Sequence, residues 1–309
     1  MALQLASFYD VQRMSLIAIE QLTKRYGSRL GIDRLNLSVQ EGAVYGFLGP
    51  NGSGKTTTIR ILLGFLRPSA GRACVFGHDC WGASRLIKSE IGYVPGDLRL
   101  HTWMTGRNAL QIVGQARGRD LAAKGAELAD YFGLEMTVKV MRMSRGMRQK
   151  LGLILALVHE PKLLILDEPT TSLDPLAQER LYDHIRVMAR NGHTVFFSSH
   201  VLSEVEDLCD RVAILRDGRL VTDETIDHLR DRAPRAVTIR WKSGDNAEPA
   251  TPPAMLALHR RVGGVWECDL NGKVTELIEW LASQSIDDVE ISRPNLESLF
   301  RQYYRGGDT

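Results

Sequence analysis

Residues 44–56 read VYGFLGPNGSGKT and contain the strongest structural signal in the sequence. The apolar residues 44–48 predict a buried strand, and residues 56–66 carry apolar side chains at helical spacing. Between them, residues 49–56 match the pattern G-x-x-x-x-G-K-S/T. Strand, glycine-rich loop and helix in this order are typical of a phosphate-binding loop, in which backbone N–H groups surround an anion at the start of a helix.

The loop residues have separate chemical roles. Lys55 can reach the β- and γ-phosphates of a nucleotide, and the Thr56 hydroxyl can ligate Mg²⁺. A chance glycine turn is the alternative, but it explains neither the strand before the loop nor the helix after it. The predicted nucleotide contacts are the loop and the residue that follows it: Gly49, Pro50, Asn51, Gly52, Ser53, Gly54, Lys55, Thr56 and Thr57.

A second motif, LLILDEP at residues 163–169, has two carboxylates after an apolar strand. Open α/β sheets bind ligands at the carboxyl ends of their strands. We predict that Asp167 holds Mg²⁺ through water, and that Glu168 orients or deprotonates the attacking water. Alone, the motif also fits a solvated acidic turn, and it is the phosphate-binding loop that favours the catalytic interpretation.

The composition gives limits rather than a function. The chain has 309 residues, of which 44% are hydrophobic and 25% charged, with a formal net charge of +2, so it gives no indication of nucleic-acid binding. Four cysteines without C-x-x-C spacing argue against a disulfide framework or a zinc site and fit a reducing cytosol. The longest strongly apolar stretch, residues 151–158, is too short to span a bilayer. Residues 1–13 lack the features of a signal peptide, and we expect a loose tail or an upstream start codon there.

The order of the predicted elements indicates an α/β fold. Apolar strands at 163–166 and 194–198 suit a sheet that is covered on both faces, and another short strand is expected at 91–94. Residues 105–160 are mostly helical in pattern. The remaining strands are expected to be antiparallel, at 17–22 and 35–39 and in a closing hairpin at 212–215 and 219–221.

The composition changes after about Arg235, where a loop with three prolines separates short elements. The elements expected there are strands at 237–241, 265–270 and 289–291 and helices at 274–282 and 296–304. The predicted domains are therefore an N-terminal tail at 1–15, a main domain at 16–235 and a small α+β accessory domain at 236–309.

A third motif, MSRGMRQK at residues 143–150, precedes an apolar helix, for which Ser144 is a suitable N-cap. Together with the other motifs, this order resembles the ABC ATPase family, whose signature is usually written L-S-G-G-Q. TSLDP at residues 171–175 resembles the D-loop of that family, His200 resembles its switch histidine, and Tyr26 matches the aromatic that stacks on adenine. Taken singly, His200 and Tyr26 would be a strand-end histidine and a core aromatic, so the resemblance depends on the ordered set across residues 16–235.

The resemblance implies a P-loop NTPase of the ABC ATPase type, with an antiparallel β subdomain, a helical subdomain and the small C-terminal α+β module. It implies ATP and Mg²⁺ as ligands, with Lys55, Glu168 and His200 in catalysis and Thr56 and Asp167 at the metal. The residues that it adds to the ATP contacts are Tyr26, Ser144, Gly146 and Asp174.

The resemblance also implies partners. Two such domains dimerise head to tail, so the second chain would be another copy or a related ATPase subunit, and each ATP would lie between the loop of one chain and the signature of the other. An integral membrane permease would hold the chain on the cytoplasmic, inner face of the membrane, and no nucleic acid is expected. IGYVPGD at residues 91–97 and LESLF at 296–300 resemble the bacterial exporter branch that moves drugs, antibiotics or lipids, although the second also fits an ordinary closing helix.

Two departures from the family pattern affect these expectations. Gly96 stands where a glutamine usually contacts Mg²⁺ and transmits the state of the site to the permease. Three alternatives follow: the contact is dispensable, a neighbour such as Asp97 substitutes for the glutamine, or hydrolysis is weakened. The signature has Met143, Arg145 and Met147 where Leu, Gly and Gln are usual. Because Ser144 and Gly146 remain, we expect activity, with Arg145 tuning it.

Two other functions stay open on the sequence alone. A soluble ABC ATPase acting on DNA or ribosomes usually has paired ATPase domains, a coiled coil, zinc-binding cysteines or a basic arm, and this sequence has none of them. A regulatory protein that binds ATP without turnover is disfavoured by Lys55, Asp167, Glu168 and His200, whereas Gly96 keeps it possible.

Overall fold

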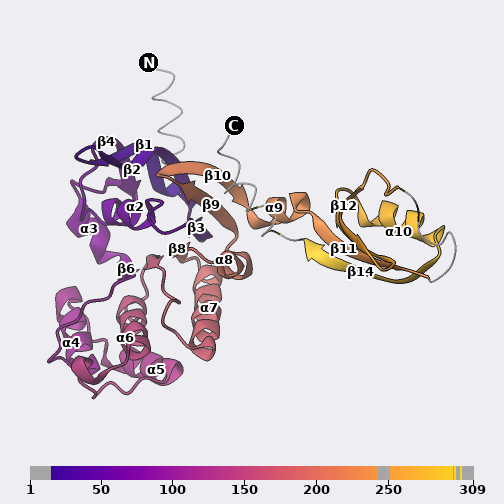
Figure 1. The fold of residues 1–309 in the computed structure, drawn as a ribbon. Helices are drawn as coiled ribbons and strands as arrows, with labels where there is room; N and C mark the ends of the chain where they lie inside the picture. Colours follow the sequence, from indigo (N-terminus) through magenta and orange to yellow (C-terminus); the bar gives the residue numbers. More distant parts are fainter. Residues whose placement is uncertain (1–14, 243–248, 250, 295, 297–299, 301–309) are drawn as a thin grey trace. The chain divides into compact units, whose positions relative to one another are not determined.

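The computed structural model describes residues 15–242, 249, 251–294, 296 and 300 (Figure 1). The chain divides into two compact units, Met1–Thr225 and Ile226–Thr309. The predicted main domain extends to residue 235 and therefore includes the helix α9 (Ile226–Arg232). In the structure, α9 belongs to the second unit, whose first strand begins after two further residues. The tail predicted at 1–13 lies outside the described residues.

The first unit is built on a six-stranded sheet with the order β10-β9-β3-β8-β7-β6. Five of these strands run parallel and β10 pairs antiparallel to β9, which confirms the predicted hairpin. The parallel strands β3, β7 and β8 are buried along their whole length, as expected for a sheet with both faces covered. The strands are β3 (Val44–Leu48), β6 (Ile91–Val94), β7 (Leu163–Asp167), β8 (Thr194–Ser199), β9 (Arg211–Arg216) and β10 (Arg219–Thr225).

A second, antiparallel sheet of the first unit has the order β2-β1-β4-β5. Its apolar side chains, such as Ile17 and Leu35, pack into one core with Phe47 of β3 and Ile59 of the helix after the loop. The strands β4 and β5 were not predicted, because β4 has only three buried residues and β5 has two residues in all. The strands are β1 (Ser15–Tyr26), β2 (Arg29–Gln40), β4 (Ala70–Val75) and β5 (His78–Asp79).

Three helices of the first unit, α4, α5 and α6, lie together. Figure 1 shows them in the lower part of the view, apart from α2 and the antiparallel sheet. These three helices confirm the helical region predicted at 105–160. The helices are α2 (Lys55–Leu62), α3 (Ser84–Ser89), α4 (Gly106–Arg117), α5 (Ala122–Phe132), α6 (Arg145–Leu157), α7 (Pro175–Arg190) and α8 (Leu202–Leu208).

The second unit contains a four-stranded antiparallel sheet with the order β12-β13-β11-β14, together with the helices α9 and α10. Its own core contains Trp266, which stacks edge-on against Trp241 at 5.0 Å between ring centroids, and Leu277 of α10. The helix predicted at 296–304 lies largely outside the described residues. The elements are β11 (Arg235–Trp241), β12 (Leu256–Val262), β13 (Val265–Leu270), α10 (Val274–Ala282) and β14 (Ile286–Pro294).

Candidate nucleotide-binding and catalytic site

The loop between β3 and α2 has a backbone that glycine alone adopts easily. Gly52 and Gly54 have φ angles of +84° and +109°, and a Cβ at Gly49 would lie 2.5 Å from the Leu215 carbonyl oxygen. Gly54 gives α2 no side-chain cap, and the buried Ser53 hydroxyl has no hydrogen-bond partner among the described residues. The first N–H groups of α2 and this hydroxyl are therefore available to an anion, which fits a bound phosphate.

Lys55 lies almost entirely inside this loop, with 4% of its surface exposed. Its Nζ donates to the carbonyl oxygens of Gly49 at 2.6 Å and Pro50 at 3.2 Å. The same Nζ lies 3.2 Å from Glu168 Oε1. A buried ammonium held by these oxygens is positioned to neutralise a phosphate that enters the loop.

Asp167, at the end of β7, is held by two hydroxyls from neighbouring elements. Thr56 Oγ1 donates to Asp167 Oδ2 at 2.9 Å, and Ser198 Oγ donates to Asp167 Oδ1 at 3.1 Å. Burial raises the pKa of Asp167 above its ordinary value, and the two hydroxyl hydrogen bonds oppose that rise. Hydroxyl and carboxylate oxygens are the ligands that Mg²⁺ prefers, so Thr56 and Asp167 fit the predicted metal site.

Glu168 lies between the lysine of the loop and a histidine. Its backbone has a φ of +50°, and its N–H donates to the Ser198 carbonyl at 3.0 Å. Its Oε2 lies 3.3 Å from His200 Nδ1, while Oε1 faces Lys55. With its side chain 23% exposed, the carboxylate can reach a water molecule and can also be oriented by His200.

Tyr26 ends β1 on the side of the phosphate-binding loop. The residue is 46% exposed, which excludes the core-aromatic alternative, and its hydroxyl lies 3.5 Å from Thr57 Oγ1. Lys24 Nζ lies 5.4 Å from the ring centroid. An exposed ring next to the loop is available for stacking on a base.

The residues of the third motif form a separate cluster at the start of α6. The Ser144 hydroxyl accepts a hydrogen bond from the Met147 N–H at 3.1 Å and so caps the helix. A Cβ at Gly146 would lie 2.7 Å from the Ser172 carbonyl oxygen, so this position holds glycine because the D-loop backbone packs against it. Within the described part of the chain, no hydrogen bond or ion pair joins Ser144 or Gly146 to residues 49–57.

Asp174 belongs to this second cluster. Its Oδ1 accepts from the Ala177 N–H at 2.8 Å and caps α7, and its Oδ2 lies 2.9 Å from Lys150 Nζ on α6. The hydrogen bond from Lys150 and that from Ala177 lower the pKa of Asp174. The D-loop is thus tied to the signature helix rather than to the phosphate-binding loop of its own chain.

Gly96 follows β6 and lies next to Asp167, the carboxylate predicted to hold the metal. A Cβ there would lie 3.3 Å from the Asp167 carbonyl oxygen and 3.8 Å from Asp167 Oδ2, so a longer side chain would reach the site. Asp97 is paired instead with Arg99, at 2.8 Å between carboxylate oxygen and guanidinium nitrogen, and its side chain is 75% exposed. In this structure Asp97 does not fill the position that Gly96 leaves empty.

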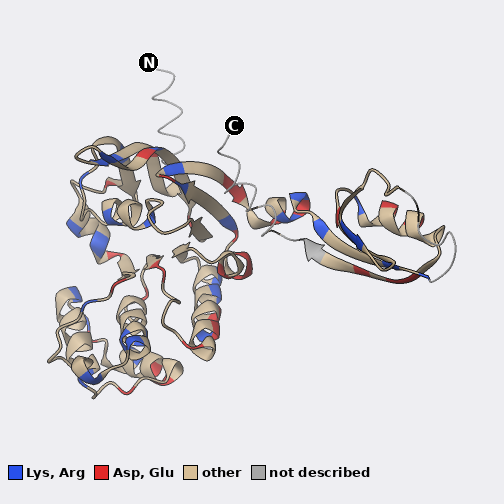
Figure 2. Cartoon of the chain, in the orientation of Figure 1, with Lys and Arg blue, Asp and Glu red and all other residues tan. Residues whose placement is uncertain are grey.

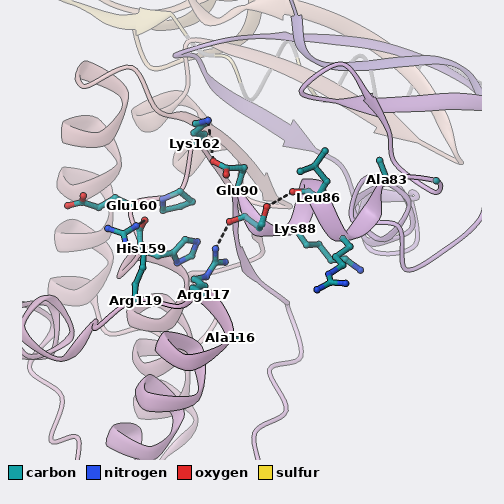
Figure 3. Close-up of a pocket in the computed structure, with 14 residues that line it drawn as sticks. Ala83, Leu86, Lys88, Glu90, Ala116, Arg117, Arg119, His159, Glu160 and Lys162 are labelled. Atoms are coloured by element: carbon teal, nitrogen blue, oxygen red, sulfur yellow. Dashed lines mark hydrogen bonds and ion pairs between the residues drawn. The ribbon is translucent and has the colours of Figure 1, made fainter.

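A cavity of about 970 Å³ lies beside α3, α4 and the start of β7 (Figure 3). The lining contains two acidic side chains, Glu90 and Glu160, and a larger number of basic ones. The basic side chains are Arg85, Lys88, Arg117, Arg119 and Lys162. An adjacent, more apolar cavity of about 350 Å³ is lined by Phe65, Tyr93 and Leu98 among others. Leu98 lies two residues from Gly96, so this surface is continuous with the segment beside the metal site.

The structure thus brings together Lys55, Thr56, Asp167, Glu168 and His200, whereas Ser144, Gly146 and Asp174 lie elsewhere. Sequence reasoning missed Ser198, which holds Asp167. The hydroxyl in FFSSH at residues 196–200, at the end of an apolar strand, was the available signal.

Comparisons with known proteins show the family of the chain. A model of the ABC transporter family matches residues 32–171. The chain is 40% identical to the bacitracin transport ATP-binding protein BcrA of Bacillus licheniformis, over 71% of this chain and 72% of that protein. It is 33% identical to the daunorubicin resistance ATP-binding protein DrrA3 of Streptomyces coeruleorubidus, over 92% of this chain and 94% of that protein.

Solved structures share the fold. One described as the ATP binding subunit of an ABC transporter matches with a TM-score of 0.66 and 27% identity, over 70% of this chain and 92% of that one. The dimeric post-hydrolysis state of the cassette MJ0796, bound to ADP and Pi, matches with a TM-score of 0.62 over 68% of this chain and 98% of that one, and at 22% identity it supports the fold alone. The predicted family and fold class are confirmed: the chain belongs to the ABC transporter family, as an ATP-binding protein and ATPase of that family.

Proposed function

We propose that this chain hydrolyses ATP at the interface of a dimer and thereby drives export of a drug, antibiotic or lipid-like cargo through a separate membrane permease. The observation that carries the proposal is the placement of Glu168 between Lys55 and His200, beside the Thr56–Asp167 pair. The names of the bacitracin and daunorubicin relatives support the cargo class.

The chemistry follows from the positions of these side chains. Lys55 neutralises the β- and γ-phosphates, and Glu168 accepts a proton from, or orients, the water that attacks the γ-phosphate. His200 holds the Glu168 carboxylate in place. Mg²⁺, when bound with ATP at Thr56 and Asp167, supplies charge neutralisation at the phosphate oxygens.

The proposed dimer is supported by the separation of the two clusters. Ser144 and the N–H groups at the start of α6 are donors suited to a γ-phosphate, yet they have no contact with the loop of their own chain among the described residues. A head-to-tail arrangement with a second copy, or with a related ATPase subunit, brings the signature of one chain to the loop of the other. ATP closes this dimer, and loss of phosphate opens it.

The proposed permease contact is the surface around the two cavities beside α3 and α4. The apolar lining suits a cytoplasmic helix of the permease, and the basic side chains favour acidic residues on that helix. Through Leu98 and Gly96 this surface adjoins Asp167, which gives a route by which nucleotide state affects the permease. The chain would then work at the inner face of the membrane.

Within the described ranges, no helix is long and apolar enough to cross a membrane.

The test is to purify the tagged chain from detergent-solubilised membranes of its own host and to measure ATP hydrolysis by the recovered complex. We expect a protein with several spanning helices to co-purify and to raise the hydrolysis rate above that of the chain alone. Glu168→Gln should leave the complex intact and abolish the stimulated rate. Recovery only with ribosomes or DNA, without a spanning protein, would contradict the transport function.

One observation favours a second function, a regulatory protein that binds ATP without turnover. Gly96 leaves no side chain next to the Asp167 carboxylate, at the position where a glutamine usually contacts the metal. The two functions differ in a direct measurement: the transporter subunit releases phosphate from Mg-ATP in repeated turnovers, whereas the regulatory protein binds ATP and releases none.

A further inference from the structure

One buried hydroxyl holds the segment that carries His200. This histidine follows β8 directly, between Ser199 and Val201. The Ser199 Oγ accepts a hydrogen bond from the Val201 N–H at 2.9 Å, and Ser199 is only 2% exposed. The Ser199 carbonyl accepts a second hydrogen bond, from the Gly49 N–H of the phosphate-binding loop at 3.3 Å. Ser199 therefore fixes the backbone on both sides of His200.

A carboxylate completes the environment of this hydroxyl. Ser199 Oγ donates to Glu204 Oε2 at 2.5 Å, so the hydroxyl is used both as donor and as acceptor. Glu204 lies in the first turn of α8, a helix with three acidic residues and no basic one (Figure 2). A hydrogen bond to an ionised carboxylate is stronger than one between neutral groups. Glu204 thus ties the start of α8 to the segment that contains His200.

Glu204 is also held from the side of α7. Tyr182, on that helix, packs edge-on against Phe197 of β8 at 6.4 Å between ring centroids. Burial, and then the charge of the nearby Glu204, raises the pKa of Tyr182, so its hydroxyl stays protonated and donates to that carboxylate. The Glu204 carboxylate is therefore fixed between two hydroxyls, and α7 is the helix that begins after Asp174 of the D-loop.

We propose that Glu204, acting through the Ser199 hydroxyl, is a positioning residue for His200. It keeps the imidazole against Glu168, and ATP hydrolysis then depends on it. The inference rests on the proposed role of His200 in holding the Glu168 carboxylate. The His200 side chain is 43% exposed, with Nδ1 3.3 Å from Glu168 Oε2, so packing alone does not fix the ring. Without the bond from Ser199 to Glu204 the turn at 199–201 relaxes, and a displacement of about 1 Å near the reacting groups can lower a rate about 100-fold.

The experiment measures kcat and KM for Mg-ATP hydrolysis by the purified full chain. Ser199→Ala removes the hydroxyl and keeps the carbonyl that pairs with Gly49, whereas Glu204→Ala removes the carboxylate. We expect each of these variants to lower kcat about ten- to a hundredfold and to leave KM unchanged, because the nucleotide contacts stay in place. Glu204→Gln keeps an oxygen that accepts from Ser199 and should recover most of the wild-type kcat.

Matched controls come from two exposed positions of α8. Ser203→Ala removes a hydroxyl and Asp207→Ala removes a carboxylate, and both should match wild type. A loss in Asp207→Ala as large as that in Glu204→Ala would assign the effect to the charge of α8 and overturn the inference. Binding of a fluorescent ATP analogue shows which variants are folded. If Glu204→Ala does not fold, Ser199→Ala, which removes a single oxygen, gives the same test.

Combination with His200→Ala separates positioning from a general structural role. With no imidazole to position, Ser199→Ala and Glu204→Ala should add less than about twofold to the loss caused by His200→Ala. Losses that multiply in the double variants would overturn this inference alone. Normal rates in both single variants beside a slow His200→Ala would do the same. A His200→Ala chain that hydrolyses ATP at the wild-type rate would overturn the proposed role of His200 and this inference with it.

Discussion

Two buried charged side chains of the first unit, Lys55 and Asp167, are each surrounded by polar partners. Lys55 is enclosed by loop carbonyls and by Glu168, and Asp167 is enclosed by two hydroxyls. Each charge has partners already in place, so a phosphate or a metal ion enters a site whose groups need little rearrangement. His159 is the contrasting case, because it is buried away from this site and has a partner for only one ring nitrogen among the described residues.

His159 makes the unfolding free energy depend on pH. Burial, together with the neighbouring Arg117, lowers the pKa of His159 from 6.5 to about 4. The folded protein therefore binds this proton more weakly than the unfolded chain, and stability is lost as pH falls from 6.5 through 4. Between pH 7 and pH 4, wild type should lose about 3 kcal/mol more than His159→Gln, whose amide can still donate to the Ile91 carbonyl.

Urea unfolding at a series of pH values checks this prediction. His101→Gln, at an exposed histidine, is the matched control and should follow the wild-type curve. If the unfolding free energies of wild type and His159→Gln changed in parallel between pH 7 and pH 4, the lowered pKa of the buried His159 would be contradicted.

At the residue scale, the sequence predicted the chemical groups well, because each motif places its groups in one short segment. Asp167 and Glu168 follow one strand, and Lys55 and Thr56 follow one loop. Ser198 was missed because its role depends on the parallel pairing of β8 with β7, which sets Asp167 opposite Ser198. The pairing of Asp97 with Arg99, which leaves Gly96 without a substitute, likewise became visible only in the structure.

Among the elements, α6 and α7 are linked by Asp174, which performs two functions with one carboxylate. One oxygen caps α7 at the Ala177 N–H, and the other pairs with Lys150 of α6. The D-loop between β7 and α7 is held against the signature helix by this residue and by the close approach of Gly146 to Ser172.

Two substitutions separate these functions of Asp174. Asp174→Ala removes both the cap and the ion pair and should lower the unfolding free energy. Asp174→Asn keeps a capping oxygen and loses only a half-exposed ion pair, so its unfolding free energy should stay close to that of wild type. Chemical unfolding of both variants gives the comparison, and an equal loss in the two would assign the effect to the ion pair.

Elements with a long apolar run or clear helical spacing were predicted closely, and those defined by their neighbours were not. The observed bounds of β3, β6, β13 and α10 coincide with the predicted ranges. The missed strand β12 has a single buried residue and three consecutive basic or histidine side chains, so no alternation marks it. Its strand structure comes from pairing with β13.

For the whole molecule, the arrangement of the two clusters in the first unit is the most consequential feature. Lys55, Thr56, Asp167 and Glu168 lie together at the phosphate-binding loop, whereas Ser144 and Asp174 belong to a second cluster at the starts of α6 and α7. The second unit has a separate core around Trp266 and contributes none of these residues. We propose that these two clusters are the halves of a composite site, so that two chains are needed to form one complete site.

We propose Glu168 as the group that acts on water in this ATPase. The most direct test is the rate of phosphate release from Mg-ATP by purified Glu168→Gln, compared with wild type and with Glu160→Gln, a control at an exposed glutamate. We predict that Glu168→Gln still binds ATP and hydrolyses it at least about 100-fold more slowly, while Glu160→Gln matches wild type. Hydrolysis by Glu168→Gln at a near-normal rate would contradict the account.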